Sequence, residues 1–254
     1  MKKYDYLRVA ILLLLVEFAQ GEFWNVSQNM SIQDALQKAS PGDTILVKAG
    51  TYSENLNISK PLVLKGVEMP VVDGRGKGWT ITLSTDGIVL EGFVATNSGK
   101  FSEAEGIKII SNNNIIRNNT IKNCSLGMTL LNSTNNTIKA NRLTNNRNGI
   151  LLSTSHRNSI MNNDVNNNQN YGVYLNISNY NIIKNNNVTS NKKFGMIFNN
   201  SSNNIISANS ASNNNLCGIS IDKSDNNEVS ANFALHEKNG ICINKSNIIN
   251  FSKS

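Results

Sequence analysis

Histidine and acidic side chains are scarce in this chain. Its 254 residues include 2 histidines, 3 cysteines and 17 acidic residues. The acidic residues are dispersed, whereas glycoside hydrolysis requires two carboxylates at a fixed separation. His156 and His236 lie far apart in the sequence, although metal sites are built from clustered ligands. We therefore expect neither catalytic residues nor a metal site.

Long apolar runs are absent after residue 21. Residues 1–21 have the pattern of a secretory signal peptide, with basic residues before an apolar core, Val9 to Val16, and small residues up to Gly21. The core is too short to span a bilayer comfortably, and an uncleaved anchor is the alternative. We expect residues 22–254 to form one domain without a transmembrane helix, in a protein that is secreted, periplasmic or at the cell surface.

A concentrated basic surface is also missing. The net charge is +7, and removing residues 1–21 deletes three basic and two acidic residues, which leaves +6. The basic residues are scattered and are not interleaved with aromatic residues. We expect no nucleic-acid partner and only a mild preference for acidic surface polymers.

A glycine-led apolar pattern recurs through the second half of the chain. Each glycine is followed by apolar residues at the next position and two positions further on, as in Gly149-Ile150-Leu151-Leu152. The glycines are 21 to 23 residues apart, at Gly106, Gly127, Gly149, Gly172, Gly195, Gly218 and Gly240. Alternate residues of a strand share a face, so each unit predicts one short strand with two inward side chains. A fixed period in this range indicates a solenoid.

Two asparagine signals accompany the glycines at fixed phase. The first is Asn114, Asn136, Asn158, Asn181, Asn204 and Asn227, and the second, five residues later, is Asn119, Asn141, Asn163, Asn186, Asn209 and Asn232. Short apolar segments follow both, so each unit holds three short strands separated by polar corners. This predicts an all-β fold, a single-stranded right-handed parallel β-helix of about ten coils. A disordered Asn-rich segment would not keep glycine and isoleucine in phase over seven repeats.

The corners explain the abundance of asparagine. A tight corner needs backbone conformations near the left-handed region, which Asn and Gly tolerate and β-branched residues do not. Stacked corners also let Asn amides form hydrogen-bonded ladders along the solenoid. By the same phase argument, Cys124, Cys217 and Cys242 do not stack on one another in adjacent coils, so we expect free or buried thiols.

The amino-terminal part predicts a cap. Residues 31–39 form a short amphipathic helix in which Ser31 and Asp34 resemble a capping box. Its apolar face consists of Ile32, Ala35, Leu36 and Ala39. We expect this helix to cover the open end of the apolar column, which protects a solenoid from edge-to-edge association.

Several segments resemble a known family. Ser31-Ile32-Gln33-Asp34-Ala35, Ala49-Gly50-Thr51-Tyr52 and Lys60-Pro61-Leu62-Val63-Leu64 look like the opening of secreted pectin-lyase-like β-helix proteins. Gly87-Ile88-Val89-Leu90-Glu91-Gly92-Phe93 and the regular repeats from about 87 to 250 resemble the NosD group, periplasmic copper-associated proteins of nitrous oxide reductase maturation. The resemblance implies a parallel β-helix and, as cofactors, copper or calcium. The residues themselves indicate no cofactor, because no ligand cluster is visible.

The middle residue of each apolar unit is predicted to point outward. Leu151, Tyr174 and Ile197 would then stack on successive coils as an exposed apolar strip. Such a strip could receive a sugar ring or a protein partner. The alternative is that a loop, such as residues 98–105, or the carboxyl-terminal tail lies across it.

These observations favour a non-enzymatic role, either structural or in binding carbohydrate, with a cell-envelope polymer as partner. The alternatives are a polysaccharide lyase or hydrolase, which would need converging carboxylates, and an accessory factor for copper-enzyme maturation. Sequons for N-linked glycans are frequent in this Asn-rich sequence, and Asn57, Asn132, Asn176 and Asn187 are candidate glycosylation sites.

Overall fold

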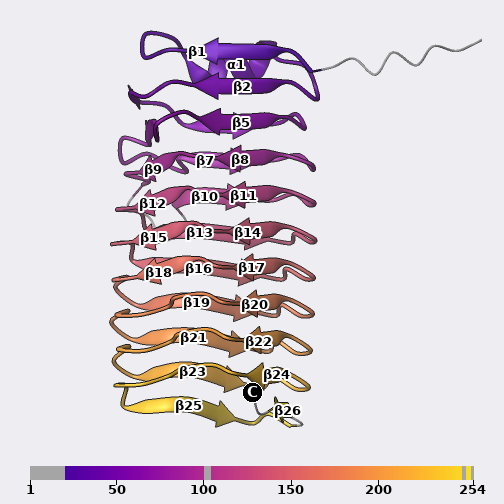
Figure 1. Ribbon diagram of the computed structural model, residues 1–254, viewed down its shortest axis with the longest axis vertical. Helices are drawn as coiled ribbons and strands as arrows, with labels where there is room; N and C mark the ends of the chain where they lie inside the picture. Colours follow the sequence, from indigo (N-terminus) through magenta and orange to yellow (C-terminus); the bar gives the residue numbers. More distant parts are fainter. Residues whose placement is uncertain (1–20, 100–103, 248–249, 253–254) are drawn as a thin grey trace, which may run out of the picture.

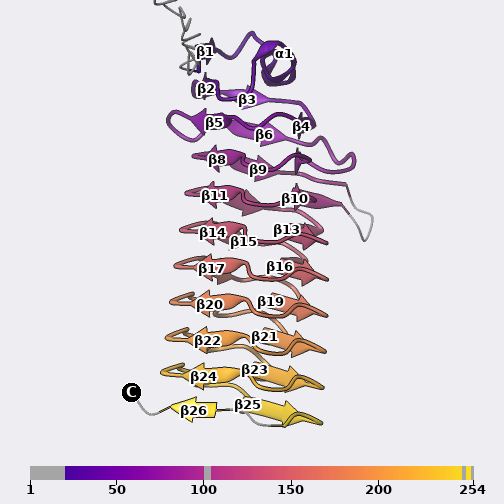
Figure 2. The same cartoon turned by 90° about the vertical axis from the view of Figure 1, so that its right-hand side faces the viewer.

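The computed structural model describes residues 21–99, 104–247 and 250–252. The expected signal peptide therefore lies almost entirely outside the described residues. The described chain winds into a right-handed parallel β-helix with three sheets, and every strand pairing within them is parallel (Figure 1). The coils stack regularly from the first strand to the last (Figure 2).

The three sheets follow the three strands of each coil. Sheet A has 11 strands: β1 (Phe23–Val26), β2 (Thr44–Val47), β5 (Val63–Gly66), β8 (Val89–Glu91), β11 (Ile115–Arg117), β14 (Thr137–Lys139), β17 (Ser159–Met161), β20 (Ile182–Lys184), β22 (Ile205–Ser207), β24 (Glu228–Ser230) and β26 (Asn250–Ser252). Sheet B has six: β3 (Thr51–Tyr52), β6 (Val71–Asp73), β9 (Val94–Thr96), β12 (Thr120–Lys122), β15 (Arg142–Thr144) and β18 (Asp164–Asn166). Sheet C has nine: β4 (Leu56–Ile58), β7 (Ile81–Leu83), β10 (Glu105–Ile109), β13 (Leu126–Leu131), β16 (Asn148–Ser153), β19 (Tyr171–Asn176), β21 (Phe194–Asn199), β23 (Cys217–Asp222) and β25 (Asn239–Asn244).

The core is one apolar column, as predicted from the glycine-led pattern. Ile150 pairs with Val173 and Leu152 with Leu175, and all four side chains are fully buried. The same holds for the equivalent residues from Ile107 to Ile221. The last coil departs from the pattern, because Ile241 and Ile243 are 39% and 45% exposed. No described coil stacks on β25, so its inward side chains are covered on one side only.

The repeated glycines are required by close backbone approach. A Cβ atom placed on Gly149 would lie 2.2 Å from the carbonyl oxygen of Gly172, the equivalent glycine of the next coil. Placed on Gly172, it would lie 2.2 Å from a methyl group of Val188. Both distances are far below van der Waals contact, so no larger residue fits without moving the coil.

Asparagine ladders run along the corners as predicted. In the second set, the Oδ1 atom of Asn163 accepts hydrogen bonds from both the backbone N–H and the amide of Asn141, at 2.9 and 3.1 Å. Sequence analysis missed a third asparagine ladder and a serine ladder. The third asparagine ladder contains Asn146, Asn168, Asn191 and Asn214, and the serine ladder contains Ser133, Ser155, Ser178, Ser201, Ser224 and Ser246. Buried corner polar groups are thereby hydrogen-bonded from coil to coil.

The corner conformations correct one expectation. Asparagine is the most frequent non-glycine residue with positive φ, at 14 of 28 such positions in the described chain, in agreement with the prediction. However, the β-branched residues Thr154 and Ile177 also adopt left-handed conformations, each with φ of 50°. The stacked corner forces this backbone shape on whichever residue occupies it, and a β-branched residue pays about 1–2 kcal/mol for it.

The amino-terminal cap forms as expected. Helix α1 (Ile32–Lys38) buries Ile32, Ala35 and Leu36 against the end of the core column. The Oγ atom of Ser31 accepts a hydrogen bond from the N–H of Asp34, which confirms the N-cap. The carboxylate of Glu54 accepts two further N–H groups of the first turn, those of Ile32 and Gln33. Helix α1 lies beside β1 at one end of the stack (Figure 1).

Two of the three cysteines are paired, contrary to expectation. Cys217 on β23 and Cys242 on β25 form a disulfide, with their Cα atoms 6.4 Å apart. They are offset by three positions along their strands, since Cys217 pairs in register with Asn239. Strand proximity in neighbouring coils is sufficient for a disulfide, whereas we had required equal phase. Cys124 is free and buried, as expected.

Candidate functional site

The predicted strip lies on the outer face of sheet C. Leu151 pairs in register with Tyr174, and Tyr174 pairs with Ile197, so the three side chains are neighbours on β16, β19 and β21. All three are half-buried, whereas the flanking Ile150, Leu152, Val173 and Leu175 are fully buried. We call Leu151, Tyr174 and Ile197 the outer strip.

A second column runs beside the outer strip and was missed from the sequence. It occupies the position just before each glycine and contains Glu105, Leu126, Asn148, Tyr171 and Phe194. The ring centroids of Tyr171 and Tyr174 are 5.1 Å apart with an edge-to-face geometry. The fixed position before each glycine could have indicated this column in the sequence. Its residues are acidic, aliphatic, polar and aromatic in turn, so they do not suggest one face of a sheet. The two columns together form an aromatic surface over β19 and β21.

The surroundings of Tyr171 on this surface keep its hydroxyl group neutral. Burial raises the pKa of Tyr171 to about 12, and Tyr174 adds to the rise while Arg147 opposes it. Its hydroxyl therefore stays protonated at neutral pH and can donate or accept a hydrogen bond. Arg147 and Lys193 each precede a residue of the second column. The edge of the surface is accordingly basic.

A small hollow adjoins the outer strip on β10, β13 and β16. Its volume is about 220 Å³, and Leu151 belongs to both the hollow and the strip. Glu105 and Thr129 line it and are only 4% and 3% exposed. The Nζ atom of Lys108, also in the lining, lies 3.8 Å from the centre of the Trp79 ring. The lining of this hollow thus combines the polar residues Glu105, Lys108, Thr129 and Ser153 with three leucines.

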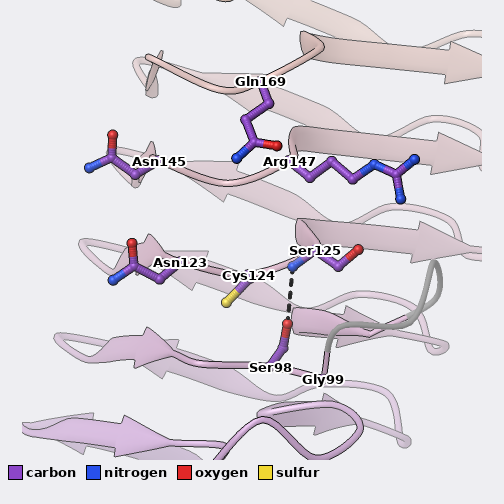
Figure 3. Close-up of a pocket in the computed structure, with 8 residues that line it drawn as sticks. All are labelled: Ser98, Gly99, Asn123, Cys124, Ser125, Asn145, Arg147 and Gln169. Carbon is purple, nitrogen blue, oxygen red and sulfur yellow. Dashed lines mark hydrogen bonds between the residues drawn. The ribbon is translucent and has the colours of Figure 1, made fainter.

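A second hollow lies at the corner that leads into sheet C (Figure 3). It has a volume of about 370 Å³ and is lined by Ser98, Gly99, Asn123, Cys124, Ser125, Asn145, Arg147 and Gln169. The Oγ atom of Ser98 accepts a hydrogen bond from the N–H of Ser125 at 3.2 Å. Burial raises the pKa of Cys124, so its thiol is protonated at neutral pH and is a poor nucleophile. This hollow offers amide and guanidinium groups but no activated side chain.

The acidic residues are distributed over different faces. Glu91 on sheet A forms salt bridges with Arg117 and with Lys65, the latter at 2.9 Å. Burial opposes ionisation of Glu91, but both cations lower its pKa, with a net shift downward. Asp164 lies on sheet B beside Arg142. Among the described residues, no three His, Cys, Asp or Glu side chains are grouped as a metal site would require.

The candidate glycosylation sites differ in accessibility. Asn57, Asn132 and Asn187 are exposed, and Asn176 is half-buried. The Oδ1 atom of Asn176 accepts a hydrogen bond from the amide of Asn199 at 3.0 Å. An N-linked glycan is attached to Nδ2, and the Nδ2 atom of Asn187 already donates a hydrogen bond to the carboxylate of Asp164 at 2.9 Å. Asn57 and Asn132 are therefore the better-placed sites.

Comparison with known sequences identifies the family. The profile described as "Periplasmic copper-binding protein (NosD)" matches residues 37–254. The chain belongs to the NosD family. The search of curated proteins found no match. No helix in the described part of this NosD-family chain is long and apolar enough to cross a membrane.

Several solved structures share the fold. Pectate lyase Pel9A has a TM-score of 0.62 at 13% identity, over 91% of this chain and 79% of that one. Dettilon tailspike protein (gp208) has a TM-score of 0.67 at 18% identity, over 83% and 54%. A double mutant of the periplasmic alginate epimerase AlgG has a TM-score of 0.52 at 18% identity, over 90% and 55%. This NosD-family chain spans little more than half of the last two, and identities this low establish the fold alone.

The family description raises the question of copper. The chain's soft donors do not fit such a site: Cys217 and Cys242 are bonded to each other, and Cys124 is buried. The Nδ1 atom of His156 accepts a hydrogen bond from the N–H of Asn179 at 3.0 Å. Met128 and Met196 are fully buried in the apolar core. These cysteines, this histidine and these two methionines therefore do not form a clustered donor set of the kind copper prefers.

Proposed function

We propose that the protein is an extracytoplasmic, non-enzymatic carbohydrate-binding β-helix that binds a polysaccharide along the outer face of sheet C. The observation that carries this proposal is the outer strip with its flanking Tyr171 and Phe194. Aromatic and aliphatic side chains on one flat face can stack against the C–H faces of sugar rings, and the tyrosine hydroxyls can bind sugar hydroxyls. The pectate lyase and alginate epimerase among the structural neighbours support the choice of carbohydrate as ligand.

The direction of the strip suits a linear polymer. Adjacent coils of a parallel sheet are about 4.8 Å apart, so the strip runs along the solenoid axis across β16, β19 and β21. A polysaccharide that follows this axis would contact one coil after another. The basic edge at Arg147 and Lys193 would favour a polymer that carries acidic groups near these coils. A flat face buries little of each sugar, so we expect weak affinity per unit.

The arrangement of carboxylates argues for binding over cleavage. Glu105 and Asp222 both belong to strands of sheet C, but they are five strand spacings apart, or about 24 Å. Retaining and inverting glycosidases need their two carboxylates within about 10 Å of each other. The proposal uses no metal cofactor, because the soft donors do not form a cluster. Copper-enzyme maturation would need ligands from a partner.

Replacement of Tyr174 tests the proposal. Tyr174→Ala should weaken oligosaccharide binding at least several-fold, because it removes a ring from the centre of the strip. The melting temperature should change little, since this side chain lies outside the core column. Binding would be measured by calorimetric titration with oligosaccharides of neutral and of acidic sugars.

Tyr180→Ala is the matched control. Tyr180 is 56% exposed and lies at a corner away from sheet C, where its ring is 5.8 Å from the guanidinium of Arg157. Its replacement should leave oligosaccharide binding unchanged. If both variants bound as the parent does, the strip would not be the binding surface.

A further inference from the structure

The hollow on β10, β13 and β16 contains a buried hydroxyl group without a partner. Thr129 lies between the inward residues Met128 and Leu130, so strand alternation directs its side chain outward into the hollow. It is 3% exposed, and its Oγ1 atom has no hydrogen-bond partner among the described residues. Buried hydroxyl groups are nearly always hydrogen-bonded, since leaving one unpaired costs about 1–3 kcal/mol. Such a group in a binding cavity indicates a ligand that completes it.

The surrounding groups define what this ligand must offer. Glu105 contributes a buried carboxylate and Ser153 a second hydroxyl group. A carboxylate accepts hydrogen bonds, whereas hydroxyl groups both donate and accept. Leu126, Leu131 and Leu151 supply apolar walls. A compound with several adjacent hydroxyl groups on one edge and C–H groups on its faces matches both features.

The size and charge of the hollow limit the ligands that it can bind. A volume of about 220 Å³ is below the 300–1,000 Å³ of pockets for drug-sized ligands, so the hollow holds one small ring. The buried carboxylate of Glu105 would repel an anionic group placed beside it. Lys108 also belongs to the lining, and its ammonium group lies over the ring of Trp79. The cavity therefore suits an uncharged ring.

We propose that this hollow is a subsite for one neutral pyranose unit, held by Thr129, Glu105 and Ser153 and stacked against Leu151. The subsite rests on the proposed function, because Leu151 joins it to the outer strip. The bound polymer then has a neutral unit over β10, β13 and β16, and any acidic units lie toward Arg147 and Lys193. This distribution makes the ligand a polymer that contains neutral sugars, rather than one of uronic acids alone.

Thr129→Val provides the sharpest test, because it replaces the hydroxyl group with a methyl group of similar shape. Without sugar, the melting temperature should rise, since the variant no longer buries an unpaired hydroxyl group. Binding of neutral methyl glycosides of glucose, galactose and mannose, measured by NMR titration, should weaken about threefold to tenfold, as expected for the loss of one hydrogen bond. Opposite effects on stability and binding distinguish a ligand contact from a structural role.

Thr137→Val and Glu105→Gln complete the experiment. Thr137 lies on the outer face of sheet A in the same coil, so Thr137→Val should leave sugar binding unchanged. The parent protein should bind at least one neutral methyl glycoside more tightly than methyl glucuronide, and Glu105→Gln should reduce that preference. The subsite is refuted if the parent binds none of the neutral glycosides, or if Thr129→Val melts lower and binds them unchanged.

The subsite and the outer strip are tested by different variants, so one can fail without the other. If Tyr174→Ala weakens oligosaccharide binding while Thr129→Val leaves methyl glycoside binding intact, the subsite is wrong and the proposed function stands. If Thr129→Val weakens methyl glycoside binding while Tyr174→Ala leaves oligosaccharide binding intact, the hollow binds sugar and the strip does not.

Discussion

At the scale of single residues, backbone shape decides which side chains the corners accept. Asn132, Thr154, Ile177 and Asn200 occupy equivalent corners, with φ between 46° and 50°. Asparagine tolerates this region, whereas a β-branched side chain is strained in it. Ile177 is also 49% exposed, so it gains little from burial. The corner at Ile177 is thus a local weakness in an otherwise regular stack.

Ile177→Asn should stabilise the protein by about 1 kcal/mol, because it relieves the left-handed strain and introduces the residue found at the equivalent corners Asn132 and Asn200. The change would appear as a higher urea midpoint. The converse variant, Asn200→Ile, should lower the midpoint by a similar amount. A lower midpoint for Ile177→Asn would show that the isoleucine makes a stabilising contact that outweighs its strain.

At the scale of elements, the hydrogen-bonded ladders join neighbouring coils at their corners, as the strand pairs join them in the sheets. The third asparagine ladder begins at Cys124, whose N–H donates to Asn146 at 3.0 Å. At its other end, Glu237 follows Asn214 by 23 residues and takes the place of the next asparagine. Both carboxylate oxygens of Glu237 are buried. Burial raises the pKa of Glu237, and the polar groups of Asn214 oppose the shift only in part.

This ladder end predicts a pH dependence. With its folded pKa above the unfolded value, Glu237 binds more protons when folded, so stability falls as pH rises from about 4.5 through the raised pKa. Glu237→Asn should remove this loss of stability at higher pH. The amides of Asn239–Asn244 should then be better protected from hydrogen exchange at pH 7 than in the parent. At pH 4 the variant and the parent should exchange alike. Equal exchange at pH 7 as well would show that Glu237 does not weaken the last coil.

The periodicity of the sequence predicted the strands more completely than it predicted the corners. The inward positions of Ile150 and Leu152 and the outward position of Leu151 follow from alternation, which is a local property of a strand. The Cys217–Cys242 pair does not follow, because it depends on the distance between strands of neighbouring coils. The hollow at Thr129 was also missed, since its lining comes from three coils and its threonine resembles any polar surface residue.

At the scale of the whole molecule, the regular stack of coils presents one outer face, that of sheet C, which we propose binds carbohydrate. Each coil contacts only its neighbours, so stability is built up coil by coil. Helix α1 covers one end of the core, while the described residues leave Ile241 and Ile243 half-covered at the other. The aromatic surface over β19 and β21 lies within the stack, with described coils on both sides. A ligand there binds to a backbone already held in place.

A glycan-array screen of residues 22–254 tests the central claim, that the outer face of sheet C binds carbohydrate. The parent protein should bind at least one class of polysaccharide, with neutral sugars in its repeating unit. Leu151→Asp, screened in parallel, should keep its melting temperature and lose that binding, because it places a charge where the strip and the hollow meet. Absence of binding by the parent to every glycan, or full retention by Leu151→Asp, would contradict the account.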